Sequence, residues 1–199
     1  MAIVWPTPLG VDEYAAAGRA VEVPRLACPG CGAPMGSWGW YERDVRMGRV
    51  RRLAIRRQRC RGCASTHAVL PSFVALARLD AVEVIGSALG VLGRGRRGVR
   101  PVARLLDVPH TTVRDWWRRF RARAQMLAVG FSRFCVAVGG LAPRLTGGDV
   151  EVALAAVRSG WEAARRRFGA GALGRWQFAN ALVGGQLLST NTDPPWAAG

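Results

Sequence analysis

Four of the five cysteines lie in two closely spaced pairs, Cys28-Pro-Gly-Cys31 and Cys60-Arg-Gly-Cys63, with 28 residues between the pairs. Two residues between thiolates allow a tight turn to point both sulfurs at one ion, and two such turns complete a tetrahedral site. Four thiolates leave no open coordination position, so the spacing predicts one structural Zn²⁺ and no catalytic metal. The energy of binding this ion would become energy of folding.

The residues between the cysteine pairs can form a β-hairpin that returns the chain to the metal. The candidate strands are Met35–Val45 and Gly48–Arg59, with apolar residues on one face. Incidental buried cysteines or a redox pair would not explain two pairs that bracket a hairpin. His67 could replace a thiolate as a ligand, although a surface or hydrogen-bonded position suits it better. Cys135 stands alone in an apolar run and is expected in the core.

The predicted hairpin is strongly basic, with nine arginines from Arg43 to Arg61. A solvated face is the ordinary explanation of a charge run, but like charges crowded on two strands repel one another unless a counter-charge arrives. Trp38, Trp40 and Tyr41 could stack on bases, although aromatics in so small a ribbon more often form its core. The candidate nucleic-acid contacts on the ribbon are Arg51, Arg52, Arg56, Arg57 and Arg59.

The charge of the whole chain favours a polyanionic partner. There are 29 basic and 13 acidic residues, a formal net charge of +16, and every basic residue is arginine. The absence of lysine indicates a GC-rich coding bias, so the choice of arginine carries little meaning, but the bias does not explain the excess of positive charge. Nucleic acid or an anionic membrane surface would satisfy that excess.

The membrane alternative has little support in the sequence. The most apolar stretch, residues 176–192, is interrupted by four amide side chains, and no run reaches 18 apolar residues. The first 18 residues lack a basic lead-in and contain Asp12 and Glu13, unlike a secretory signal. Paired cysteines also differ from a dispersed disulfide framework. We expect a cytoplasmic, nucleoid-associated protein with no membrane partner, and no small-molecule substrate is inferred.

From Asp80 onward the hydrophobic period is helical. Asp80 is a candidate N-cap for a helix over residues 81–92, and two further helices are expected over residues 99–106 and about 111–127. The short segment Asp107-Val108-Pro109 joins the last two. Ten arginines lie between residues 94 and 123, which favours DNA binding over a generic helical hairpin with a charged face.

The run VRPVARLLDVPHTTVRDW, residues 99–116, resembles the helix-turn-helix of bacterial repressors and of the N-terminal modules of insertion-sequence transposases. In this resemblance Ala103 is the small residue where the two helices cross. Asp107 replaces the usual turn glycine, and aspartate tolerates the left-handed conformation better than most residues. The implied core between the helices is Val102, Leu106, Val108, Val113 and one of Trp116 or Trp117.

The resemblance implies that the second helix enters the major groove with its N-terminal part facing the bases. Arg114 suits bidentate contact with guanine, and threonine can touch a thymine methyl group or a phosphate. The exposed positions of this helix are His110, Thr111, Thr112, Arg114, Asp115 and Arg118. The expected phosphate contacts are Arg118, Arg119, Arg121 and Arg123, with Arg94, Arg96, Arg97 and Arg100 from the preceding loop.

The C-terminal third begins with a predicted linker over residues 128–148, marked by glycines and Pro143. A helix over residues 149–168 carries an apolar seam at steps of four and three: Val150, Leu154, Val157, Trp161, Ala164 and Phe168. A last helix is expected at about residues 173–188, before a tail over 191–199. The two helices could pair within the chain or form the interface of a homodimer, and helix-turn-helix proteins often bind as dimers.

Together these patterns predict a mainly α fold. It comprises an N-terminal arm or capping element (1–24), a four-cysteine zinc-ribbon β-hairpin (25–72), a three-helix helix-turn-helix domain (73–127), the linker and a C-terminal helical hairpin (149–190). A zinc ribbon directly before a helix-turn-helix is a combination found in insertion-sequence transposases and in bacterial proteins that resemble them.

The expected function is zinc-dependent binding of double-stranded DNA, as a transcriptional regulator or an accessory factor of a mobile element. No enzyme is expected. A transposase catalytic domain holds two metal ions with three carboxylates on a strand-rich fold, whereas the acidic residues after position 123 lie in predicted helices or in the tail. These residues are Asp149, Glu151, Glu162 and Asp193. Two alternatives remain, the DNA-binding part of a truncated or split transposase, and a zinc ribbon that binds RNA or docks a protein.

Overall fold

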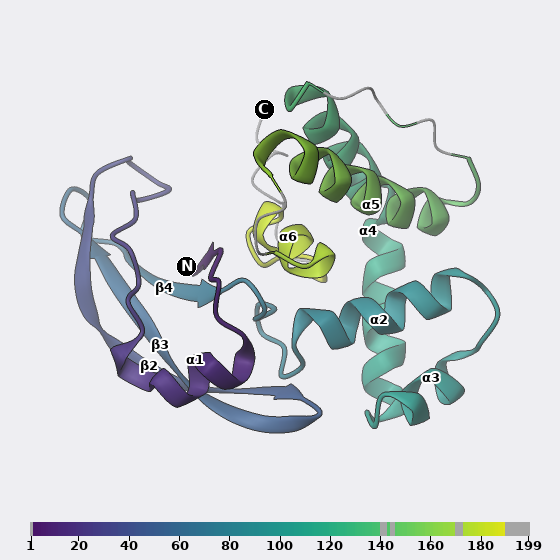
Figure 1. Cartoon of the computed structure of the whole chain (residues 1–199), viewed down its shortest axis with the longest axis horizontal. Coiled ribbons are helices and arrows are strands. Elements are labelled where there is room, and N and C mark those ends of the chain that lie inside the picture. The colour runs from purple at the N-terminus through teal and green to yellow at the C-terminus, as the bar shows by residue number, and fades with distance from the viewer. Residues whose placement is uncertain (1, 140–142, 144–145, 170–172, 190–199) are drawn as a thin grey trace.

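The computed structural model describes residues 2–139, 143, 146–169 and 173–189. A sheet with one short helix forms one side of the molecule, and five helices form the other (Figure 1). The strands are β1 (Ala2–Trp5), β2 (Met35–Met47), β3 (Arg49–Cys60) and β4 (Thr66–Pro71), in the spatial order β1-β4-β3-β2. β1 runs parallel to β4, and the other neighbours are antiparallel.

The β2–β3 hairpin turns at a single glycine, Gly48, and its strands stay paired from there to the cysteines. Gly48 has a φ of +74°, a conformation that glycine adopts without a steric penalty. At the other end Met35 pairs with Cys60. Leu53 and Ile55 alternate with more exposed residues along β3 and are fully buried under α1 (Val11–Ala17), which the 3₁₀ turn η1 (Gly18–Ala20) follows.

The prediction of a mainly α chain with a simple hairpin is wrong. The hairpin is part of a four-stranded mixed sheet, and residues 2–17, expected as an arm, supply β1 and α1. Tyr14 of α1 is fully buried and meets Phe73 edge-on, with ring centroids 5.7 Å apart. β1 is only four residues long, and its parallel partner Ala68 is distant in sequence from Ala2. Such a non-local parallel pair leaves no local periodicity in the sequence.

The helical side is built from α2 (Val82–Gly93), α3 (Val99–Leu105), α4 (His110–Ala137), α5 (Asp149–Phe168) and α6 (Arg175–Leu182). α4 is the central element, and α2, α3 and α5 all pack against it (Figure 1). None of the described helices is long and apolar enough to cross a membrane. The fully buried large side chains of this core are Ile85, Leu89, Trp116, Phe120, Leu127 and Phe131.

The predicted linker over residues 128–148 begins too early. α4 continues to Ala137 because its apolar face continues through Phe131 and Cys135, which are 0% and 2% exposed. Cys135 is therefore a core residue, as predicted. Arg123, expected at a phosphate, is only 6% exposed within this helix and lies near Met126. The predicted tail, residues 191–199, lies outside the described residues.

α5 has the predicted bounds, but only part of the predicted seam is buried. Val157 is fully buried, whereas Phe168 at the end of the seam is 68% exposed. The buried face instead consists of small residues, which allow close approach to α4 of the same chain. At Gly160 an added Cβ would lie 3.0 Å from Phe131 Cδ1. The four small buried residues are Ala153, Ala156, Gly160 and Ala163.

Two sets of polar contacts join the sheet to the helices. Asn180 of α6 donates hydrogen bonds of 2.9 Å to the carbonyl oxygens of Ser72 and Val74, in the segment after β4. Asp80 is not the N-cap of α2, a position that Ala81 takes. Its carboxylate instead accepts hydrogen bonds from the Arg46 guanidinium of β2, at 2.6 and 3.0 Å.

Two glycines of α2 provide a matched test of the packing between α2 and α6. At Gly86 an added Cβ would overlap the Trp176 indole, whereas at Gly90 its nearest neighbour would be Arg94 Nη1 at 3.9 Å. We expect Gly86→Ala to lower the free energy of unfolding by about 1–3 kcal/mol through overpacking. Gly90→Ala should raise it by about 0.5–1 kcal/mol, because alanine favours a helix interior over glycine. Chemical denaturation measures both, and equal effects of the two changes would contradict the packing.

Glu83 of α2 should make stability depend on pH. Among the described residues neither carboxylate oxygen of Glu83 has a hydrogen-bond partner. Burial raises the pKa of this carboxyl above its ordinary value, and the nearby Gln177 offsets only part of the rise. A raised carboxyl pKa means that the folded state binds the proton more tightly, so stability is lost as pH rises from the ordinary glutamate pKa through the raised one.

We therefore expect Glu83→Gln to raise the melting temperature at pH 7 by ~3 °C, which corresponds to about 1 kcal/mol for a chain of this size. The difference from the parent protein should shrink below about pH 4.5, where the carboxyl is protonated in both folded and unfolded states. Thermal melts across this range test the expectation. A constant difference at all pH values would rule out titration of Glu83 as its source.

Candidate metal centre and nucleic-acid interface

The four paired cysteines meet at one end of the β2–β3 hairpin. Cys28 and Cys31 lie in the turn before β2, Cys60 ends β3, and Cys63 lies in the turn after it. The backbone N–H groups of Cys28 and Met35 bond to the carbonyls of Ala33 and Leu26, which closes the first turn. Pairing of Met35 with Cys60 then sets the second turn beside the first.

The sulfur atoms are arranged as a metal site requires. All four Sγ atoms lie within 4.8 Å of one another, with Cys31 3.4 Å from Cys60 and Cys28 3.7 Å from Cys63. Metal–sulfur bonds of ~2.3 Å in a tetrahedron place the sulfurs about 3.8 Å apart. The N–H groups of Gly62 and Cys63 point to Cys60 Sγ at 3.3 and 3.4 Å. The cluster of Cys28, Cys31, Cys60 and Cys63 can therefore hold a single metal ion.

The pKa values of these thiols indicate why the cluster favours a cation. Hydrogen bonds with the side chain and backbone of Ser65 lower the pKa of Cys63 to about 6. The backbone N–H of Cys63 is the main cause of the lowered pKa of Cys60. At Cys31 the backbone of Ala33 lowers the pKa, but the neighbouring thiols of Cys60 and Cys63 raise it to about 11. Four thiols so close together can all ionise to thiolates only if a metal ion compensates their negative charge.

His67 lies beside the cluster and is not one of its four donors. It is 2% exposed, and its Nε2 atom is 3.6 Å from Cys28 Sγ. The surface position considered for it is wrong, whereas the hydrogen-bonded one is confirmed. A neutral imidazole can donate from Nε2 to the sulfur and so stabilise the thiolate form.

The ribbon arginines divide into two groups along the hairpin. Toward the Gly48 turn they have acidic partners within the chain: Arg46 with Asp80, Arg49 and Arg51 with Asp12, and Arg52 with Asp44 and Glu42. This part needs no external counter-charge, contrary to the expectation from crowding alone. Of the predicted nucleic-acid contacts, Arg51 is only 15% exposed and Arg52 is 68% exposed.

Toward the cysteines the ribbon arginines lie against aromatic or hydroxyl groups. The Arg56 guanidinium is 3.8 Å from the Trp40 ring centroid, and that of Arg59 is 4.6 Å from Trp38. Arg57 donates to the Thr66 hydroxyl at 3.0 Å. Trp38 is 54% exposed, so the expectation that this aromatic forms a miniature core fails, while Tyr41 does pack against the α1-covered core.

α3 and α4 begin close to where the sequence predicts two helices, and a short turn joins them. Asp107 has a φ of +49°, as expected for a residue that replaces a turn glycine. The Val108 N–H bonds to the Ala103 carbonyl at 3.0 Å and closes the turn. Ala103 is 3% exposed where the helices meet, and Trp116, not Trp117, is the buried tryptophan at 1%. The other predicted core residues are buried or half-buried: Val102, Leu106, Val108 and Val113.

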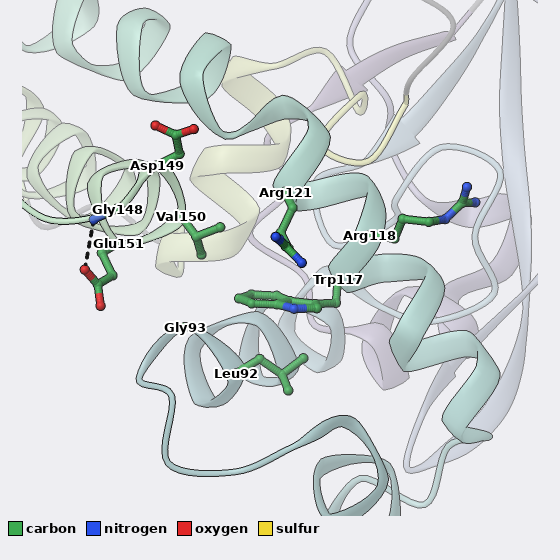
Figure 2. A pocket seen from close by; sticks show the side chains of 9 residues that line it. All are labelled: Leu92, Gly93, Trp117, Arg118, Arg121, Gly148, Asp149, Val150 and Glu151. Atoms are coloured by element: carbon green, nitrogen blue, oxygen red, sulfur yellow. Dashed lines mark hydrogen bonds between the residues drawn. The ribbon is translucent and has the colours of Figure 1, made fainter.

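Most of the predicted DNA contacts are exposed along α4, the loop before α3 and the first turn of α3. Thr112 is half-buried. A hollow of about 680 Å³ lies between α2, α4 and the start of α5. Of the side chains that line it, Arg121 points toward Trp117, while Arg118 points away (Figure 2). The exposed predicted contacts are His110, Thr111, Arg114, Arg118, Arg121, Arg94, Arg96, Arg97 and Arg100.

Asp115 has a different position from the other predicted contacts. Its carboxylate accepts hydrogen bonds of 2.8 Å from Arg118 and Arg119 and lies 3.6 Å from Arg78. Burial raises the pKa of Asp115, but the bonds from Arg118 and Arg119 outweigh this and lower it overall. The aspartate therefore orients arginines on this face, and Arg119 is only 26% exposed. Arg78 was not anticipated, because nothing in its local sequence indicates contact with α4.

Residues 28–93 match a family described as a domain of unknown function (DUF6431). No curated protein and no solved structure matches the chain. The matched stretch begins at the first cysteine of the cluster and ends with α2, so it contains the complete cluster and the β2–β3 hairpin. α3 and α4 lie outside it. The match thus supports the cysteine cluster and hairpin as parts of one unit.

Replacement of His67 tests its position next to the cluster. We expect His67→Ala to weaken metal binding by ~10-fold or more, because partners of metal ligands typically contribute that much. The stoichiometry should stay at one ion, since all four thiols remain. Competition with a chelator and the visible spectrum of the Co²⁺-loaded protein measure affinity and ligand set. Cys63→Ser is the comparison, and it should change the Co²⁺ spectrum itself. A changed spectrum in His67→Ala would instead make the imidazole a ligand.

Proposed function

We propose that the chain is a zinc-dependent helix-turn-helix protein that binds double-stranded DNA. The observation that carries the proposal is the α3–turn–α4 unit, with Asp107 in the left-handed conformation and basic side chains along the exposed face of α4. A helix presented in this way fits the major groove, about 12 Å wide. The net charge of +16 supports a polyanionic partner.

In this proposal Zn²⁺ occupies the cysteine cluster as a structural ion. Tetrahedral sites of four sulfur ligands suit zinc or iron, and only zinc has no redox chemistry. When bound, the ion would fix the two cysteine turns relative to each other and leave no open position for a substrate. Metal analysis of protein purified without added metal distinguishes zinc from iron.

Individual side chains would have separate roles at the duplex. Arg114, exposed near the start of α4, is proposed to read guanine, because its fork of donors matches the guanine O6 and N7 acceptors. Arg118 and Arg121 on α4, Arg96 and Arg97 in the loop before α3, and Arg100 in the first turn of α3 would contact phosphates. Asp115 would contact no phosphate, since like charges repel. It would instead hold Arg118 in position through their 2.8 Å hydrogen bond.

The biological role that fits best is transcriptional regulation or an accessory part in the movement of a mobile element, in keeping with the resemblance of residues 99–116 to repressors and to transposase modules. Binding as a homodimer remains part of the proposal. The buried face of α5 is used against α4 of the same chain, so a dimer would need a surface other than that face.

Removal of single charges tests the duplex interface. With a site selected from a random duplex library, we expect Arg114→Gln to relax base preference at one position, at a cost of about 1–3 kcal/mol on the preferred base. Arg118→Gln should weaken all sequences alike and reduce the slope of log K against log salt by about 0.9. Fluorescence anisotropy at several salt concentrations measures both quantities.

Arg166→Gln is the matched control, because it removes the same charge from an exposed position on α5. That position lies near Cys135, about 30 Å along α4 from Arg114 by helix rise. It should change duplex binding little. The proposal fails if the parent protein ignores duplex DNA at low salt, or if all three variants lose the same affinity.

A further inference from the structure

A group of arginines without acidic partners lies at the cysteine end of the hairpin, separate from the arginines of α4. Within the described chain, Arg25, Arg59 and Arg61 form no ion pair, whereas the arginines around the Gly48 turn do. All three are exposed. Three neighbouring guanidinium groups left without internal compensation form a local site for an anion.

These arginines surround a hollow of about 450 Å³ beside the cysteine cluster. Arg25, Arg59 and Arg61 line it together with Ser37, and no acidic residue lines it. This differs from the hollow of Figure 2, where Asp149 and Glu151 accompany two arginines. The composition of the hollow at the cysteine end therefore fits a phosphate group, which arginine contacts through parallel hydrogen bonds.

An exposed indole lies next to this hollow. The ladder between β2 and β3 shifts register between Ser37 and Gly39, and Trp38 occupies the irregularity. Trp38 remains 54% exposed although Arg59, which also lines the hollow, has its guanidinium 4.6 Å from the ring centroid. A large aromatic surface in solvent beside a cationic hollow matches the repeat of a nucleic-acid strand, in which each phosphate has a base nearby.

We propose that the cysteine end of the hairpin binds an unpaired nucleic-acid strand, with a phosphate in the hollow of Arg25, Arg59 and Arg61 and a base stacked on Trp38. The strand is unpaired because in a duplex both faces of each base are covered by neighbours, and only a free base can stack on an indole. An acidic peptide would satisfy the arginines but would leave Trp38 without a stacking partner. This site is separate from α4 and goes beyond the proposed duplex interface.

The test uses the full chain loaded with metal and a labelled oligothymidine of about twelve nucleotides, within the usual range of single-strand site sizes. We expect Trp38→Ala to weaken binding about tenfold and Trp38→Phe to restore most of it, because the phenyl ring still stacks. Arg59→Gln and Arg61→Gln should each reduce the slope of log K against log salt by about 0.7. Metal content and melting temperature of each variant establish that it is folded.

Arg52→Gln is the matched control on the same hairpin, since Arg52 is 68% exposed but paired with Asp44 and Glu42. It should change binding of the oligothymidine less than Arg59→Gln does. Arg166→Gln, which removes an exposed charge on α5 outside both proposed surfaces, should leave this binding unchanged. The Trp38 variants change only the hairpin, so the single-strand assay stands whether or not α4 binds duplex. The proposal is overturned if Trp38→Ala binds like the parent, if Arg52→Gln and Arg59→Gln lose equally, or if polyglutamate of equal charge competes as well as unlabelled oligothymidine.

Discussion

The contact between Arg46 and Asp80 holds β2 against the segment that leads into α2, where the two sides of the molecule meet. Asp80 is 3% exposed, and Arg46 approaches both of its carboxylate oxygens, at 2.6 and 3.0 Å. The backbone reinforces the pair, because Arg46 N–H bonds to the Leu79 carbonyl and Ala81 N–H bonds to the Arg46 carbonyl. A buried ion pair adds little net stability, but loss of one partner costs about 3–5 kcal/mol. Its value lies in fixing β2 against the start of α2.

This junction links the cysteine cluster to the α3–α4 unit. The cluster closes one end of the β2–β3 hairpin, and Arg46 near its other end anchors α2, which packs against α4. Arg78, between β4 and α2, approaches Asp115 of α4 at 3.6 Å, and Arg43 donates to the carbonyls of Ala75 and Arg78. A metal bound at the cluster would therefore stabilise the hairpin whose far end positions α4. The metal ion would thus influence the position of α4 through the hairpin and its hydrogen bonds, without contacting a bound nucleic acid itself.

The sequence predicted features that depend on neighbours in the chain and missed those that depend on distant ones. Cysteine spacing predicted the cluster, the period of three and four predicted α5 with its bounds, and Asp107 predicted a left-handed turn, because each has a local physical cause. The parallel pairing of Ala2 with Ala68 and the bond between Arg46 and Asp80 have no such cause, since either partner alone resembles an ordinary strand or cap residue. The exposure of Trp38 follows from a register irregularity that only the paired strands reveal.

The distribution of charge is more informative than its sum. The formal charge of +16 treats all 29 arginines alike, yet several are held within the chain: Arg46 by Asp80, Arg51 by Asp12, and Arg119 by Asp115. Among the described residues, the arginines without an acidic partner include Arg25, Arg59 and Arg61 at the cysteine end of the hairpin and Arg96, Arg97, Arg100 and Arg114 around α3 and the start of α4. Self-repulsion at these two places costs stability in the free protein, and an approaching polyanion would relieve it. The acidic partners near the Gly48 turn thus explain why the hairpin is not one uniform basic face.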